Sequence, residues 1–170
     1  MSNAFDTFNL EVKFNLDLSD LDQRYRAVLA LVHPDRFIGK TEPERRAAAD
    51  QAIRLNEAYQ RLKNPLYRAE DFLEAKGISV PGQGGQTIQH PTLLMQVMEW
   101  REELESTHKR EDLDLLEETL KKRLDFVYQA MDTSDSLVYL YLELVYLTKI
   151  LEEISYHPLR QTDAHSTHRS

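Results

Sequence analysis

Hydrophobic residues recur at helical spacing on both sides of a short proline-containing stretch. In each segment the apolar positions repeat every three or four residues, as on one face of an α-helix. These positions are Leu21, Tyr25, Val28 and Val32 in the first segment, and Ala48, Ala52, Leu55, Tyr59 and Leu62 in the second. Pro34 disfavours helical geometry at His33, so we expect the first helix to end there. The pattern predicts an antiparallel helical hairpin with His33 and Asp35 at its turn.

Capping residues and prolines mark the other helix ends around this hairpin. A short first helix should bury Phe5 and Phe8, and Ser19 with Asp22 fits a capping box for the second helix. The remaining expected bounds are Ala4–Leu10 for the first helix, Thr41 or Glu42 to Asn64-Pro65 for the third, and Leu66–Lys76 for the fourth, capped by Gly77.

The second half of the chain has the pattern of three long helices. Two regular stripes consist of Leu113, Leu116, Leu120, Leu124, Val127 and Met131, and of Leu137, Leu140, Leu144, Leu147, Leu151 and Ile154. Breaks near 107–110 and 132–134 are short enough to join antiparallel neighbours, which predicts a three-helix bundle. The run 137–151 is too short for a membrane span and contains Glu143 and Lys149.

These patterns predict an all-α protein with two domains. Residues 1–76 form the hairpin domain with its short flanking helices, and the glycine- and proline-rich residues 77–91 form a linker. Residues 92–156 form the bundle. We expect the polar residues 157–170 to be a disordered tail, with His165 and His168 as solvated side chains rather than metal ligands.

The segment Leu93–Glu105 has more apolar residues than the bundle needs. At about 100° per residue, one face suffices for the core, namely Leu93, Val97, Trp100 and Leu104. The opposite side carries Leu94, Met95 and Met98 close to Glu99 and Glu102. Apolar side chains ringed by carboxylates are typical of a partner-binding surface. Packing against the first domain or the linker is the open alternative; Tyr146 and Leu142 could extend the patch, although burial is the default for both.

Composition narrows the classes of function. The chain has no cysteine, which removes disulfides and cysteine-ligated metals. A net charge of -8 argues against nucleic acid or an anionic membrane as the main partner. The N-terminus has no secretory or transit signal, so we expect a cytoplasmic protein.

The run Tyr25–Phe37, which contains His33-Pro34-Asp35, resembles the second helix and loop of the J domain, the module that stimulates DnaK-type chaperone ATPases. With the linker and acidic bundle, nearly the whole chain to about Ile154 resembles the HscB-type co-chaperones of iron–sulfur cluster assembly. The most specific further pieces are Asn64-Pro65-Leu66, Arg68-Ala69-Glu70, Leu94-Met95 and Arg101-Glu102-Glu103-Leu104.

This resemblance implies two binding sites and no catalytic residue, cofactor or metal. A DnaK-type (HscA-like) ATPase would bind Arg24, Tyr25, Arg26, His33, Pro34 and Asp35. An IscU-type scaffold protein would bind Leu94, Met95, Met98, Glu99, Glu102 and Tyr146. The second helix also carries Asp20 and Asp22, so it is less basic than in general J domains and implies a weaker, more selective dock. The cysteine-rich N-terminal module of some members is missing.

Two alternatives belong to other classes of protein. A general protein-folding J-protein would need a client groove or a Gly/Phe-rich segment, and neither is visible. An enzyme could use His33 and Asp35 as a base and its orienter or as metal ligands, but no third ligand or nucleophile stands at suitable spacing.

Overall fold

The computed structural model describes residues 3–82 and 90–161, and every regular element in these ranges is a helix. The all-α prediction is therefore confirmed. The chain divides into two compact units, residues 1–80 and residues 81–170. No helix in the described ranges is both long enough and apolar enough to cross a membrane.

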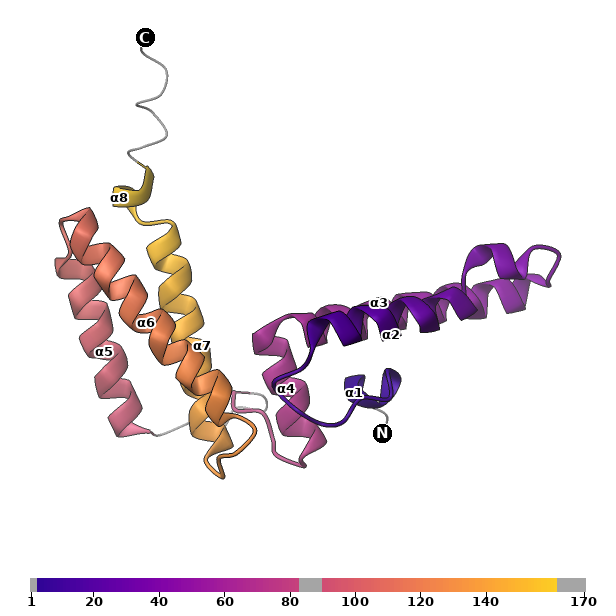
Figure 1. Ribbon diagram of the computed structural model, residues 1–170, viewed down its shortest axis with the longest axis horizontal. Helices are drawn as coiled ribbons and strands as arrows, with labels where there is room; N and C mark the ends of the chain where they lie inside the picture. The colour runs from indigo at the N-terminus through magenta and orange to yellow at the C-terminus, as the bar shows by residue number, and fades with distance from the viewer. Residues whose placement is uncertain (1–2, 83–89, 162–170) are drawn as a thin grey trace, which may run out of the picture. The chain divides into compact units, whose positions relative to one another are not determined.

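The first unit is a long helical hairpin with shorter helices at its root (Figure 1). Its elements are α1 (Ala4–Thr7), α2 (Leu18–Leu31), the 3₁₀ helix η1 (Pro34–Phe37), α3 (Glu42–Lys63) and α4 (Pro65–Ala75). Helix α3 packs against α1, α2, η1 and α4. The predicted hairpin is present, with η1 at its turn.

Two expected helix boundaries differ from the structure. Helix α1 ends at Thr7 rather than Leu10, because the chain turns at Asn9 with a positive φ of 51°. Helix α2 is capped by Asp17 rather than Ser19, since the Asp17 carboxylate accepts hydrogen bonds from the backbone N–H groups of Ser19 and Asp20. Ser19 thus lies inside the first turn of α2.

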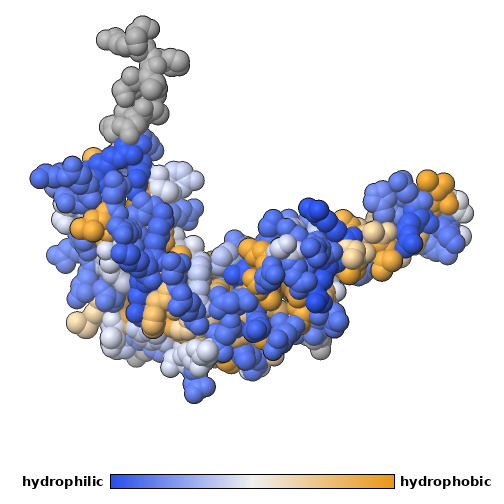
Figure 2. All heavy atoms as spheres, viewed as in Figure 1, coloured by the Kyte–Doolittle hydropathy of each residue, from blue (hydrophilic) through white to orange (hydrophobic). Residues whose placement is uncertain are grey.

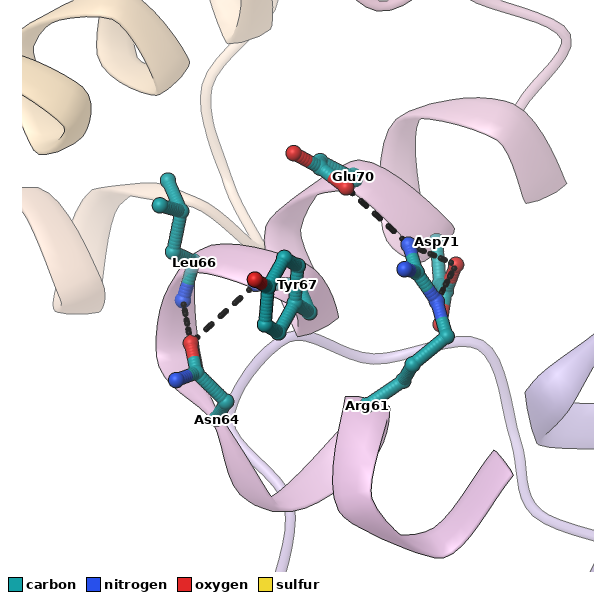
Figure 3. Close-up of polar contacts among 6 residues, drawn as sticks. All are labelled: Arg61, Asn64, Leu66, Tyr67, Glu70 and Asp71. Carbon is teal, nitrogen blue, oxygen red and sulfur yellow. Dashed lines mark hydrogen bonds and ion pairs between the residues drawn. The ribbon is translucent and has the colours of Figure 1, made fainter. Parts of the chain in front are cut away.

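The other predicted ends are confirmed. Thr41 caps α3 in a capping box with Glu44. Asn64 ends α3, and its side chain also caps α4, as Figure 3 shows. Gly77 follows the end of α4 with a φ of 74°, a left-handed conformation that favours glycine.

Aromatic rings fill the core at the root of the hairpin. Phe5, Phe8, Phe14 and Phe72 are all buried, which confirms the packing role predicted for the first two. Phe14 meets Phe72 edge to face, with ring centroids 6.4 Å apart. Leu21, Leu55 and Leu62 complete this core from α2 and α3.

A charged cluster fixes the angle between α3 and α4 (Figure 3). The Arg61 guanidinium donates to both carboxylate oxygens of Asp71, at 2.9 to 3.1 Å, and to Glu70 at 3.0 Å. The hydrogen bonds to Asp71 hold the pKa of Arg61 above its ordinary value, so the guanidinium stays charged. Because Asp71 is buried, this pairing compensates the loss of its hydration.

The second unit contains three long helices and one short one (Figure 1). They are α5 (Pro91–Ser106), α6 (Arg110–Ala130), α7 (Leu137–Ser155) and α8 (Pro158–Gln161). Each of the three long helices packs against the other two, so the predicted bundle is present. Both leucine stripes face its core, although Leu124 and Leu151 are only half-buried.

Ion pairs join the bundle helices along the edges of the core. Glu143 is buried on α7 and accepts hydrogen bonds from Arg123 of α6, at 2.5 and 3.1 Å. Arg101 of α5 pairs with Glu153 of α7 at 2.9 Å. The Glu143 carboxylate, which argues against a membrane span, is therefore paired with Arg123 within the bundle.

The residues expected to form a tail begin with a helix. In α8, Arg160 forms ion pairs with Asp114, at 2.8 Å, and with Glu117 of α6. The disordered tail predicted from residue 157 is therefore wrong for Pro158–Gln161, because these pairs hold α8 against α6. His165 and His168 lie outside the described residues, as do positions 83–89 of the expected linker.

Candidate functional site

The His33–Asp35 loop presents an imidazole and a carboxylate to solvent at the turn of the hairpin. Pro34 occupies the first position of η1, where its fixed φ suits the turn and its missing N–H is not needed. His33 has an extended backbone and caps η1. The side chains of His33 and Asp35 are 56% and 82% exposed. The loop thus fixes its backbone while leaving both polar groups accessible.

One nitrogen of His33 is already in use within this loop. Its Nδ1 accepts a hydrogen bond from the Asp35 backbone N–H at 3.2 Å. The Asp35 Oδ2 lies 3.5 Å from the same Nδ1, but this contact is an ion pair only when the ring is protonated. A ring nitrogen that accepts a hydrogen bond carries no proton. In neutral His33, the bond from the Asp35 N–H to Nδ1 therefore leaves the ring proton on Nε2. The loop therefore offers an N–H donor at Nε2 and a carboxylate acceptor at Asp35.

The three candidate residues on α2 have different environments. Arg26 is exposed. Arg24 binds Asp20 at 2.9 Å and also donates to the carbonyl oxygens of Phe8 and Asn9. It therefore ties the α1–α2 connection to α2.

Tyr25 is half-buried in a stack of rings. Its ring lies parallel to that of Tyr59 on α3, with centroids 4.1 Å apart, and meets Phe8 edge to face. Tyr25 thus holds the two arms of the hairpin together. Of the three candidate residues on α2, Arg26 is the most accessible to solvent.

An apolar pocket beside the loop was not predicted from the sequence. It lies where α2, η1 and α3 meet and is lined by Val32, Pro34, Phe37, Arg45, Ala48, Ala49 and Ala52. Leu31 at the end of α2 and Ile38 after η1 are exposed close to it along the chain, and Ile53 near the middle of α3 is exposed as well. In Figure 2, separate hydrophobic patches lie along this hairpin between hydrophilic areas. The alanine run 47–49 was the available signal, since small side chains at core positions leave space between helices.

The predicted division of α5 into two faces is confirmed. Leu93, Val97, Trp100 and Leu104 are buried, whereas Leu94, Met95 and Met98 are 42%, 65% and 68% exposed. Glu99 and Glu102 are exposed beside them. We call this set, together with Tyr146, the α5 patch.

Tyr146 of α7 reaches the α5 patch from the side. Leu94 and Tyr146 line one small pocket with His90, Leu93 and Leu142. Leu142 is buried and Tyr146 is half-buried. The burial expected for both residues is therefore confirmed in full only for Leu142. His90 also meets Tyr139 of α7 edge to face, at 5.6 Å. The α5 patch therefore extends from α5 onto α7.

The loop exposes an imidazole and a carboxylate, and the α5 patch exposes apolar side chains beside carboxylates. Among residues 3–82 and 90–161, no group of three or more His, Asp or Glu side chains is placed to hold a metal ion. An exposed His-Pro-Asp loop at the end of a two-helix hairpin, on a chain that also carries a helical bundle, is the organisation of a J-type co-chaperone.

Comparisons with known proteins specify the family. The protein-family model described as the HSCB C-terminal oligomerisation domain matches residues 89–155 of this chain. The chain is 45% identical over 121 residues to the co-chaperone protein HscB homolog of Paraburkholderia xenovorans, covering 71% of this chain and 69% of that protein. It is 46% identical over 116 residues to the homolog of Paraburkholderia phymatum, covering 68% and 66%.

Solved structures agree with the sequence relatives. The chaperone HscB of Vibrio cholerae matches with a TM-score of 0.72 and 32% identity, covering 91% of this chain and 96% of that one. Human co-chaperone protein HscB matches with a TM-score of 0.76 and 25% identity, covering 92% and 82%. The chain belongs to the HscB co-chaperone family.

Proposed function

We propose that this protein stimulates a dedicated DnaK-type (HscA-like) chaperone ATPase and delivers an IscU-type iron–sulfur scaffold protein to it. The observation that carries the first part is the exposed His33–Asp35 loop on a backbone fixed by Pro34 and η1. In this proposal Nε2 of His33 and the carboxylate of Asp35 contact the ATPase. The stimulation is allosteric, so this chain contributes no catalytic residue.

The α5 patch supports the second part of the proposal. Its leucine and methionines are exposed although they belong to a helix whose other face is fully used in the core. Flexible methionine side chains adapt to a partner surface, and the rim of Glu99 and Glu102 favours a partner with basic groups. We assign the scaffold to this patch.

Both sites on one chain give the protein its role as an adaptor. When the loop binds the ATPase, the scaffold on the bundle is held near it at an effective concentration of about millimolar, as for short linkers in general. Contact between the scaffold and the ATPase is then favoured, because both are bound to the same chain.

Steady-state ATP hydrolysis tests this function. We expect the purified protein to accelerate a DnaK-type ATPase and to do so further when an IscU-type scaffold is present. His33→Gln and Asp35→Asn should abolish the stimulation and change the stability by no more than about 0.5 kcal/mol, because both side chains are exposed. The matched controls His108→Gln and Asp50→Asn change the same residue types at exposed positions elsewhere and should leave it intact. Normal stimulation by either loop variant would refute the assignment.

A further inference from the structure

The methionines of the chain are divided between the core and one exposed surface. Met131 at the end of α6 is only 1% exposed. Met95 and Met98 on α5 are 65% and 68% exposed, and Met1 lies outside the described residues. Among the residues that the structure describes, the accessible thioether groups therefore lie only in the α5 patch. Because the sequence has no cysteine, no thiol of this chain competes with them for an oxidant.

Met95 and Met98 lie together on the outer face of α5. They are three residues apart, so their side chains are neighbours on the helix surface. Each also has an exposed glutamate four residues further along, Glu99 after Met95 and Glu102 after Met98. These carboxylates repel anionic oxidants but not an uncharged one such as hydrogen peroxide. The pair is therefore open to oxidation by a neutral peroxide.

Oxidation of these two side chains changes the property on which the α5 patch depends. Hydrogen peroxide transfers one oxygen atom to the thioether sulfur: its O–O bond breaks, an S–O bond forms, and the other oxygen leaves as water with both hydrogens. The sulfur loses two electrons and the peroxide gains them. The product, methionine sulfoxide, is polar where the thioether was apolar and flexible. Of the three exposed apolar residues of the α5 patch, only Leu94 then remains apolar.

We propose that Met95 and Met98 form an oxidation-sensitive modification site, at which conversion to methionine sulfoxide weakens binding of the scaffold protein. This inference rests on the proposed function of the α5 patch. A partner surface that packs on apolar thioethers leaves the sulfoxide oxygens without hydrogen-bond donors, and a buried polar group without a partner opposes binding. We therefore expect affinity to fall at least about tenfold. Methionine sulfoxide reductases regenerate the thioether, so the modification is reversible.

The same modification should leave the rest of the molecule unchanged. Both side chains are already largely exposed, so the added oxygen atoms do not enter the core. The His33–Asp35 loop lies in the other compact unit. Stimulation of the ATPase in the absence of scaffold should therefore be the same before and after oxidation. Loss of scaffold binding alone distinguishes this modification from general oxidative damage.

The test oxidises the full chain before the scaffold is added. The protein is treated with hydrogen peroxide, the peroxide is removed with catalase, and an IscU-type scaffold protein is then titrated in a calorimeter. Peptide mass spectrometry should find sulfoxide at Met95 and Met98 before Met131. The treated protein should bind at least about tenfold more weakly, and the two stereospecific methionine sulfoxide reductases together should restore binding.

Two double variants serve as controls. Met95→Leu/Met98→Leu should bind normally before and after treatment, because leucine has a similar volume and no sulfur. This variant keeps Met1 and Met131, so it also controls for oxidation at these positions. Met95→Gln/Met98→Gln places polar side chains at the same positions without any oxidant and should bind as weakly as the treated wild type.

The outcomes separate this inference from the function on which it rests. An untreated wild type that does not bind the scaffold would overturn the proposed function, and this inference with it. An untreated protein that binds, together with an oxidised protein that binds equally well, overturns this inference alone. So does a leucine variant that loses binding after treatment, or a treated wild type whose bundle unfolds at a much lower urea concentration than the untreated one.

Discussion

Truncation of the three exposed apolar residues on α5 tests whether the α5 patch serves binding rather than stability. We consider the triple variant Leu94→Ala/Met95→Ala/Met98→Ala and the single control Leu93→Ala. Leu93 is adjacent on the same helix and only 1% exposed. Both variants lose only apolar atoms from α5, so helix propensity and charge do not distinguish them.

The magnitudes follow from the exposed fractions. Full burial of a leucine or methionine contributes about 1.5–3 kcal/mol. The three patch residues are buried over roughly a third to a little more than half of their surface, so each truncation costs about 0.5–1.7 kcal/mol. Alanine returns a few tenths of a kcal/mol in helix propensity at each position, which leaves about 1–3 kcal/mol for the triple variant. Leu93→Ala alone should cost about 2–5 kcal/mol, since it leaves a cavity in the core.

Trp100 supplies the stability assay. It is the single tryptophan of the chain and is buried on α5, so its fluorescence during urea unfolding reports on the bundle. Scaffold binding to the triple variant should fall at least about 100-fold, because a few apolar anchors supply most of an interface's free energy. The Leu93 variant, where folded, should bind nearly normally. A triple variant that loses clearly more stability than Leu93→Ala, or that does not fold, would place the patch in the core, because three buried truncations would each cost about 2–5 kcal/mol. A triple variant that is stable and binds normally would disprove the site.

Sequence periodicity was sufficient to predict both units and the two faces of α5. The reason is geometric: four core positions at 3-4 spacing fix the rotation of a helix, so they also fix which residues lie opposite the core. They do not show whether another segment covers that side, and the exposure of Leu94, Met95 and Met98 comes from the structure. The hairpin was predicted with equal success because Pro34 stops α2 and Pro43 starts α3. These local signals act over one helical turn.

The sequence did not predict interactions between residues that lie far apart along the chain. Arg160 lies more than forty positions from Asp114 and Glu117, and nothing in its neighbourhood along the chain indicates that α8 pairs with α6. Arg24 was expected to bind a partner, yet its guanidinium reaches back to carbonyl oxygens near Asn9. The predicted capping residue of α2 was wrong for a related reason. Asp17 and Ser19 are both good N-cap residues, and only the path of the preceding chain selects Asp17.

Three more changes test the remaining assignments. Arg26→Ala should weaken binding to the DnaK-type ATPase and flatten its salt dependence without lowering stability, whereas Arg24→Ala should loosen the α1–α2 connection; a salt titration and a thermal melt distinguish them. Arg61→Ala should cost about 2–4 kcal/mol because it strands the buried Asp71, while Asp71→Asn should cost only about 1 kcal/mol because the more exposed Arg61 keeps Glu70; equal losses in urea unfolding would contradict this asymmetry. Hydrogen bonds from the Thr41 backbone and hydroxyl lower the pKa of Glu44, so its contribution to stability is present above pH 4.5 and is lost as the pH falls through the lowered value; an NMR titration of the Glu44 carboxyl with a midpoint at or above 4.5 would disprove the cap.

The two ends of the hairpin differ in packing. The root has a well-filled core that stabilises the fold, whereas the end that carries His33 and Asp35 is more open and more exposed to solvent. At the root, α3 contributes Leu55 and Leu62 to a core that also contains the phenylalanines of α1, the connector and α4. In the first half of α3, Ala48 is the buried apolar residue, and the space between the arms remains open as the pocket beside the loop. Leu31 at the end of α2 and Ile38 after η1 stay exposed next to this pocket. Exposed apolar surface at this end contributes little to the stability of the unit, and it lies beside His33 and Asp35, the two residues proposed to contact the ATPase.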